Sequence, residues 1–210
     1  AVTAVTFSVA GVYELRLTAS DSALTSSDDI TVTANPAAPV LPPDPVSVAP
    51  PLDRTGVTTV FKATEFLYSG SNPIQTGVVP GSIAPIRAAV LRGKVMSREG
   101  QSLSGVRISI LSHPELGQTL SREDGWFDLA VNGGGLLTVS YEKAGLLPAQ
   151  RQVNVPWQNY SSLPTVALIP LDPLVSTITA GLGAMQVHQA SIVTDNDGSR
   201  RATLLFPAGT

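Results

Sequence analysis

Across residues 86–171 the sequence alternates short apolar runs with clusters of turn-forming residues, and this pattern limits the fold more than any other feature. Seven such runs are IRAAVLRGKV, VRISIL, QTLS, WFDLAV, LLTVSYEK, RQVNV and TVALIP. Gly, Pro, Asn and Asp separate them, as in the turn Glu123–Gly125, where the glycine suits a positive φ. Several short strands, each with one apolar face, predict an antiparallel β-sandwich. We expect Val106, Ile108 and Ile110 to point into its core.

The composition agrees with an all-β chain and excludes several kinds of partner. The 210 residues include 18 Gly and 17 Pro, and only 14% are charged. A formal net charge of −3 without a cluster of Lys or Arg predicts no nucleic-acid partner. No apolar run approaches the ~20 residues that a membrane-spanning helix needs, so we expect no membrane insertion. The absence of Cys excludes disulfides and thiolate metal sites.

Residues 1–35 have the pattern expected of the last three strands of an immunoglobulin-like (Ig-like) sandwich. The expected strands cover residues 2–9, 13–19 and 29–34. Tyr13, after Gly11, stands where such sandwiches have a tyrosine corner. The phrase FSVAGVYELRLTASDSALTSSDDITVTA resembles PKD and cadherin-like repeats. Because these strands would leave an apolar face open to water, we expect another element to cover it and the chain to be an excerpt of a longer protein.

The other segments are expected to connect or follow the sandwich. Residues 36–56 contain PAAPVLPPDPVSVAPP, whose prolines favour an extended, semi-rigid linker. Residues 57–85 are predicted to be a connecting strand and loop, with VTTVFKATEFLY as one or two strands. Residues 172–210 are predicted to begin a further β domain, with a hairpin turn at Asn196–Gly198.

Two family resemblances rest on particular motifs. The run that begins LRGKVMSREGQSLSGVRISIL and continues through EDGWFDLAV resembles the carboxypeptidase regulatory-like, or transthyretin-like, domain. More narrowly, LYSGSNPIQTGVVPGSI, HPELGQTLSREDGWFDLAVNGGG, PAQRQVNVPWQNY and DGSRRATLLFPAGT resemble the segment that precedes the YD-repeat shell in bacterial Rhs-type and teneurin-like proteins. This second resemblance covers the chain from Glu65 onward.

The second resemblance implies a non-catalytic structural and docking module of a large secreted or cell-surface protein of bacterial type. Such a module links Ig-like repeats to a β-shell that can enclose a toxin. Its partners would be neighbouring domains of the same polypeptide, together with a cell-surface protein or glycan. Two alternatives stay open: a glycan- or protein-binding adhesion module, and an accessory domain of a secreted peptidase.

We predict no enzyme activity and no cofactor, because the candidate catalytic residues are poorly arranged. His113 and His188 are far apart, and neither has a partner at a zinc-motif spacing. Ser112, His113 and Glu115 are adjacent on a strand end and cannot converge as nucleophile and base must. The glycines at 133–135 precede a strand rather than a helix, which disfavours a phosphate-binding loop.

Asp195 and Asp197 form the one weak candidate for a metal site, because DNDG imitates the start of a calcium loop. Arg200 and Arg201 follow directly, so a hairpin turn is the preferred interpretation. A second calcium hypothesis involves Asp21, Asp28 and Asp29.

Two further hypotheses concern aromatic and lysine side chains. Trp126, Trp157 and Tyr160 could form a sugar-binding platform, although anchors in a core or in a domain interface are favoured. An intramolecular isopeptide bond would involve Lys94, Asn154 and Glu142.

Overall fold

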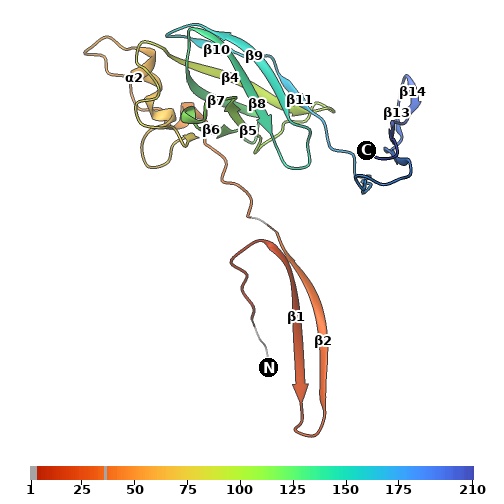
Figure 1. Cartoon of the computed structure of the whole chain (residues 1–210). Coiled ribbons are helices and arrows are strands. Elements are labelled where there is room, and N and C mark those ends of the chain that lie inside the picture. Colours follow the sequence, from red (N-terminus) through yellow and green to blue (C-terminus); the bar gives the residue numbers. More distant parts are fainter. Residues whose placement is uncertain (1–3, 36) are drawn as a thin grey trace. The chain divides into compact units, whose positions relative to one another are not determined.

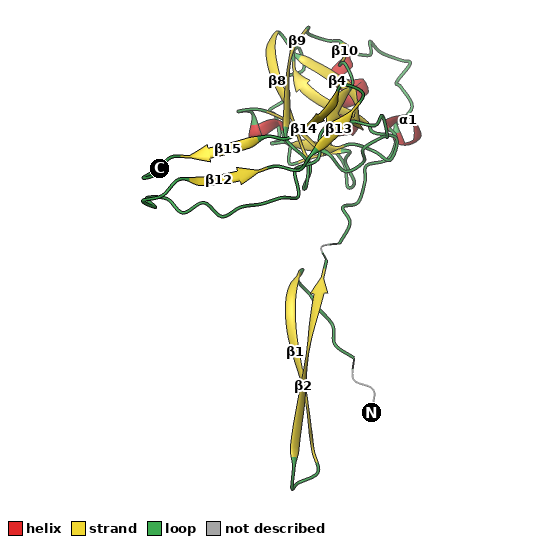
Figure 2. Ribbon diagram, turned by 90° about the vertical axis from the view of Figure 1, so that its right-hand side faces the viewer, coloured by secondary structure: helices red, strands yellow, loops and turns green. Residues whose placement is uncertain are grey.

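The computed structural model describes residues 4–35 and 37–210 and divides into two compact units. The first unit is Ala1–Val40 and the second is Leu41–Thr210. Strands dominate both units (Figures 1 and 2). Among the described residues, no helix is long and apolar enough to cross a membrane.

The first unit is an antiparallel hairpin of β1 (Gly11–Ser20) and β2 (Thr25–Ala34). On one face the register pairs Leu15 with Ile30, and on the other it pairs Arg16 with Asp29. One face is therefore apolar and the other polar, as the alternation predicts.

The strand expected at residues 2–9 is wrong for residues 4–9, which form no strand; residues 2 and 3 lie outside the described residues. Phe7 instead packs against Tyr13, with ring centroids 4.5 Å apart. The Tyr13 hydroxyl donates a 2.6 Å hydrogen bond to the carbonyl of Val9, the bond that defines a tyrosine corner. These contacts fold the segment back onto the start of β1.

The second unit contains two β-sheets that form the predicted sandwich. In the four-stranded sheet, β4 pairs antiparallel with β7 and parallel with β10 and β11. These strands are β4 (Ala88–Ser97), β7 (Trp126–Asn132), β10 (Tyr160–Ser162) and β11 (Val166–Leu168). The five-stranded sheet has the order β3 (Gln75–Thr76), β6 (Gln118–Leu120), β5 (Arg107–Ile110), β8 (Gly135–Glu142) and β9 (Ala149–Val155). All seven expected strands are present, and the all-β sandwich is confirmed.

The core lies between the two sheets. Ile108 is 0% exposed and Ile110 is 3% exposed, which confirms the predicted register of β5. Phe127 of one sheet meets Tyr141 of the other edge to face, with centroids 5.8 Å apart. A Cβ at Gly93 would lie 2.8 Å from the Phe127 ring, so the glycine leaves the space that the ring needs.

Residues predicted to be strands before the sandwich form helix instead. These elements are α2 (Val60–Thr64) and the 3₁₀ helix η1 (Glu65–Leu67), which contact β4 and β7. The Thr59 hydroxyl caps α2 by accepting a hydrogen bond from the amide of Lys62. Phe61 packs on the core, and Thr64 and Leu67 are buried. The residues that face the core are therefore three positions apart, as in a helix, and not two positions apart, as in a strand. The predicted strand is wrong for this reason.

The proline segment is not extended throughout. Pro45–Val48 forms a single helical turn, α1, with Asp44 at its N-cap and Pro45 at its first position. Asp44 accepts a 2.9 Å hydrogen bond from the amide of Val46, and Pro45 is buried. The expectation of an extended linker over residues 36–56 is therefore wrong at Pro45–Val48, and from Leu41 onward the chain belongs to the second unit.

Two short hairpins follow the sandwich in the sequence. The outer hairpin pairs β12 (Gln186–Gln189) with β15 (Thr203–Phe206). The inner hairpin pairs β13 (Val193–Asp195) with β14 (Gly198–Arg200), which confirms the turn predicted at Asn196.

Candidate functional site

A cluster of charged side chains lies on the outer face of the four-stranded sheet. The register places Arg92 of β4 opposite Asp128 of β7. Arg92 Nε donates to Asp128 Oδ1 at 2.6 Å, and Arg122 Nη1 donates to Asp128 Oδ2 at 2.8 Å. Asp128 is only 1% exposed, so two guanidinium groups compensate one buried carboxylate. The hydrogen bond to Asp128 raises the pKa of Arg92.

This cluster borders a hollow of about 230 Å³, which we call the Arg92 hollow. It is lined by Asp44, Val46, Arg92, Arg122, Asp124 and Trp126. Asp124 accepts a 2.9 Å hydrogen bond from the backbone amide of Trp126 and so shapes the rim. Gly125 has φ +80°, and a Cβ there would lie 2.4 Å from the carbonyl of Val95. The hairpin turn predicted at Glu123–Gly125 therefore holds Trp126 beside the two arginines.

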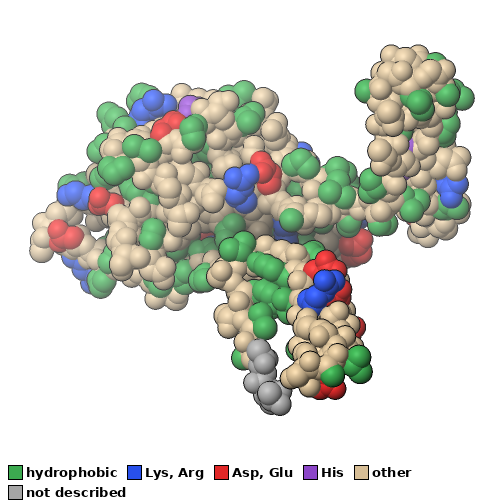
Figure 3. All heavy atoms as spheres, turned by 60° about the horizontal axis from the view of Figure 1, so that its bottom comes forward, with side chains coloured by type: hydrophobic (Ala, Val, Ile, Leu, Met, Phe, Trp, Pro, Cys, Tyr) green, Lys and Arg blue, Asp and Glu red, His purple; other side chains and the backbone are tan. Residues whose placement is uncertain are grey.

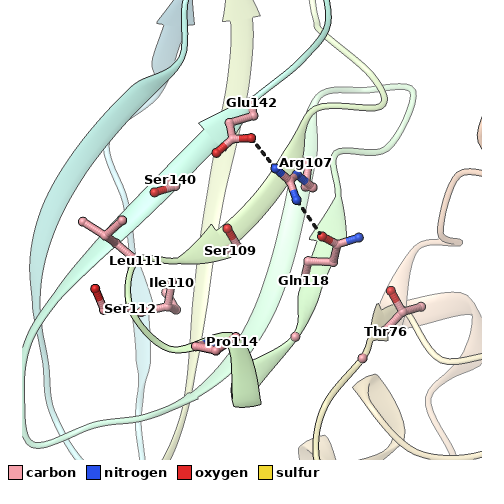
Figure 4. Close-up of a pocket in the computed structure, with 12 residues that line it drawn as sticks. Thr76, Arg107, Ser109, Ile110, Leu111, Ser112, Pro114, Gln118, Ser140 and Glu142 are labelled. Atoms are coloured by element: carbon pink, nitrogen blue, oxygen red, sulfur yellow. Dashed lines mark hydrogen bonds and ion pairs between the residues drawn. The ribbon is translucent and has the colours of Figure 1, made fainter.

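A second, larger hollow of about 420 Å³ lies on the five-stranded sheet (Figure 4). Ser109, Ser112 and Ser140 contribute hydroxyl groups to its lining. Figure 4 shows Arg107 between Glu142 and Gln118, both of which accept hydrogen bonds from it. The charged side chains of this face thus pair with each other, and no nucleophile is held against a base among the residues that line it.

The Ser112, His113 and Glu115 sequence does not build a catalytic arrangement. His113 Nδ1 lies 2.8 Å from Glu115 Oε1, and this hydrogen bond lowers the pKa of the Glu115 carboxyl. Ser112, with φ +63°, lines the larger hollow, and within the described residues its hydroxyl has no hydrogen bond to His113. The pair is exposed and belongs to a polar loop.

A Ser, His and Asp combination that the sequence analysis missed occurs after the sandwich. His188 Nδ1 lies 2.8 Å from Ser176 Oγ. Asp172 accepts instead from the amide and hydroxyl of Ser191 and from the amide of Leu174. Because the carboxylate does not orient the imidazole, this geometry lacks the order of a catalytic triad.

Asp195, one of the two residues of the calcium hypothesis, is paired with an arginine in the structure. Arg200 donates to both carboxylate oxygens of Asp195, one of them at 2.9 Å, and the Asp197 amide donates to Asp195 Oδ1 at 3.0 Å. The bond to Arg200 is the main cause of the lowered pKa of Asp195. A guanidinium group therefore already neutralises the Asp195 carboxylate, as expected for the preferred hairpin-turn interpretation.

The second group of aspartates stabilises its own hairpin instead of gathering around an ion. Asp21 accepts from the backbone amides of the β1–β2 turn, and Asp29 forms a bidentate pair with Arg16 at 2.7 Å. Asp28 accepts from the amide of Asp29. Within residues 4–35 and 37–210, no group of three or more His, Cys, Asp or Glu side chains could hold a metal ion.

The three aromatic residues do not form one platform. Trp126 begins β7, whereas Trp157 packs on the loop that follows β7, where a Cβ at Gly134 would lie 1.7 Å from the indole nitrogen. Tyr160 pairs with Val90 on the other side of β4. All three side chains are exposed, so they are not core anchors. Trp157 also fills the glycine loop, which removes the phosphate-binding interpretation.

The structure divides the three residues of the isopeptide hypothesis between the two sheets. Lys94 lies in the four-stranded sheet, whereas Asn154 and Glu142 lie in the five-stranded sheet. Glu142 is paired with Arg107, and Asn154 is exposed.

Gln75 is a buried polar residue that the sequence did not mark. Its amide nitrogen donates to the carbonyls of Leu116 at 2.6 Å and Ala130 at 2.9 Å, and its oxygen accepts from the Ala130 amide at 2.7 Å. Gln75 thereby joins β3 of one sheet to the free edge of β7 in the other. Its role is structural.

The two sheets, with charged side chains paired to each other on their surfaces, define a transthyretin-like β-sandwich. Residues 83–168 match the teneurin TTR-like domain family. The chain is 35% identical to Teneurin-m of Drosophila melanogaster over 147 residues, which is 70% of this chain, and 31% identical to Teneurin-3 of Danio rerio over 132 residues, which is 60% of it. It spans about 5% of the length of either relative.

Two solved structures resemble the chain distantly. A chain of a cohesin–X-dockerin complex from Acetivibrio cellulolyticus matches with a TM-score of 0.35 and 16% identity, over 45% of this chain and 65% of that chain. The 3-chlorocatechol 1,2-dioxygenase from Rhodococcus opacus matches with a TM-score of 0.35 and 13% identity, over 46% of this chain and 65% of that chain. Neither similarity supports an argument about function.

Proposed function

We propose that this chain is a non-catalytic structural and docking module of a large, multidomain, teneurin-like protein that is secreted or displayed on a cell surface. The observation that carries the proposal is the match to a segment that forms only about 5% of Teneurin-m. In the full form of the proposal, the module joins an Ig-like repeat to a YD-repeat β-shell of Rhs type that encloses a toxin.

The first unit supports the Ig-like part of the proposal. The tyrosine corner at Tyr13 fixes the entry to β1, and the hairpin presents one apolar face. Leu17 is 73% exposed and Ile30 is 61% exposed on that face. Figure 3 shows hydrophobic side chains gathered on the hairpin. Apolar strands of this kind gain stability when a second sheet covers them.

The polar groups of the second unit support the non-catalytic part. Asp128, Gln75 and Glu142 are engaged in hydrogen bonds or ion pairs that hold strands together. They are therefore used for architecture, and the outer faces remain as surfaces for neighbouring domains.

Cysteine labelling in the parent protein and in the 210-residue chain tests the docking role. The 210 residues contain no Cys, so a single Leu17→Cys substitution gives one reactive thiol within this segment. We expect rapid labelling in the 210-residue chain and strong protection in the parent protein, where the second sheet covers Leu17. Thr18→Cys, on the opposite face of β1, is the matched control and should react rapidly in both. Equal reactivity of the two thiols in the parent would overturn the Ig-like docking role.

A further inference from the structure

We propose that the Arg92 hollow binds a neutral hexose, as the terminal sugar of a glycan. This inference goes beyond the docking role and does not rest on it. The volume of about 230 Å³ is below the ~300–1,000 Å³ of sites that hold drug-sized ligands, so the hollow suits a single ring.

The charges around the hollow favour a neutral ligand. Arg92 and Arg122 supply donors, whereas Asp44 and Asp124 supply acceptors. With Asp128 beneath them, three carboxylates face two guanidinium groups and leave one net negative charge. The two exposed carboxylates would repel an anion, and the two arginines would repel a cation. A sugar hydroxyl both donates and accepts, so a neutral polyol can satisfy both kinds of group.

An unsatisfied donor provides a second observation that points to a ligand. Arg122 is 8% exposed and lines the hollow, and its buried Nε has no hydrogen-bond partner among the described residues. Asp124 Oδ1 is 3.8 Å from this Nε, beyond hydrogen-bond distance. Buried donors are usually paired, so an unpaired one indicates a missing acceptor. Because Nε itself is inaccessible in this conformation, Asp124 drawn closer by a bound sugar would supply that acceptor.

Trp126 gives the hollow an apolar wall. Its side chain is 39% exposed at the rim, and the turn that Asp124 caps fixes its backbone. The C–H face of a hexose can pack on an indole ring while its hydroxyl groups reach the charged groups. Arg92 is held in place by Asp128, so little side-chain entropy is lost on binding.

NMR titration of the 210-residue chain tests the proposal. The probes are the methyl glycosides of glucose, galactose, mannose and N-acetylglucosamine, with sulfate as a small anion and lysine amide as a small cation. We expect saturable shifts of the Trp126 indole N–H with at least one sugar, and no shift of the Trp157 indole N–H. A preference for sulfate or lysine amide, or no saturable shift with any sugar, would overturn the proposal.

Substitutions sharpen this test. Trp126→Ala and Asp124→Asn should each weaken sugar binding by about tenfold or more, which corresponds to ~1.4 kcal/mol. Asn at 124 keeps an acceptor for the turn, and unchanged circular dichroism will show that both variants fold. Trp157→Phe is the matched control and should bind the sugar with the same affinity as the unsubstituted 210-residue chain. Equal affinity in Trp126→Ala would overturn the site while leaving the Leu17→Cys labelling result unaffected. Glycolipid vesicles and a glycopeptide that carry the bound sugar will then distinguish a lipid headgroup from a protein-linked glycan.

Discussion

The β1–β2 hairpin and the β-sandwich have the same alternation of apolar and polar residues but differ in what covers the apolar face. Ile108 in the sandwich is completely buried, whereas Ile30 in the hairpin is 61% exposed. In the ion pair between Arg92 and Asp128 the carboxylate is buried, whereas in the pair between Arg16 and Asp29 both side chains are exposed to solvent. The comparison teaches that alternation specifies which face is apolar, while burial depends on a second layer.

The largest effect is expected from Asp128→Asn. The substitution removes the buried carboxylate that Arg92 and Arg122 share, and it leaves the buried guanidinium group of Arg122 without its partner. Removing one partner of a buried pair costs about 3–5 kcal/mol, and we expect a loss of this size in the free energy of unfolding from urea titration.

The hairpin offers the matched control for that prediction. Asp29→Asn removes the same kind of pair, but both side chains are exposed, so water screens their attraction and the change should be far smaller. Equal losses at the two sites would contradict the claim that burial separates the two regions.

Truncating one isoleucine in each region tests the comparison in the apolar residues. Ile108→Ala should lower the free energy of unfolding of the sandwich by about 2–5 kcal/mol, because it leaves a cavity in a closed core. Ile30→Ala should change the stability of the hairpin, measured by amide hydrogen exchange, by about 0.5 kcal/mol or less. A large effect at Ile30 would mean that something covers the hairpin in solution.

Alkaline pH should act on the sandwich through Tyr141. Burial raises the pKa of Tyr141 to about 12, and within the described residues its hydroxyl has no hydrogen-bond partner. Because the folded state favours the neutral phenol, the contribution to stability is complete below pH ~10 and is lost as the pH rises through about 12. The loss from this group is about 1.4 kcal/mol per pH unit at most.

Tyr141→Phe should remove that part of the alkaline loss and leave neutral-pH stability equal or higher, because no hydrogen bond is lost. Urea titrations at neutral pH and across pH 10–12 measure both effects. A parallel loss in the two proteins would show that other groups, such as Tyr68, whose pKa burial also raises to about 12, dominate the alkaline range.

A small, local effect is expected from Tyr13→Phe in the hairpin. The substitution removes the 2.6 Å bond to the Val9 carbonyl, which is worth about 0.5–1.5 kcal/mol. We expect faster amide exchange at the start of β1, while the urea midpoint of the sandwich stays unchanged. A shift of that midpoint would show that the two units are energetically coupled.

The sequence predicted the parts of the fold that depend on period and turn chemistry. Val106, Ile108 and Ile110 are buried as their alternation requires, and Gly125 and Gly198 adopt the positive φ values that tight turns need. These features are local, so a single chain shows them directly.

The features that the sequence did not predict depend on contacts between distant residues or on competing local signals. Phe61 and Leu67 have helical spacing that β-branched neighbours concealed, so α2 and η1 were assigned to strands. Nothing near Gln75 indicates that it bonds to Ala130, 55 positions later. The Arg92 hollow arises because β4, the β7 turn and the proline segment meet, and no single motif encodes that meeting.

The close approach of Phe127 to Gly93 limits how the sequence can vary at these two positions. The two positions are neighbours on adjacent strands and share one volume, which the ring occupies because the glycine leaves it empty. A larger residue at 93 is compatible with the fold only together with a smaller one at 127. We therefore expect these two positions to covary among related sequences, so that a change in residue size at one position is accompanied by the opposite change at the other.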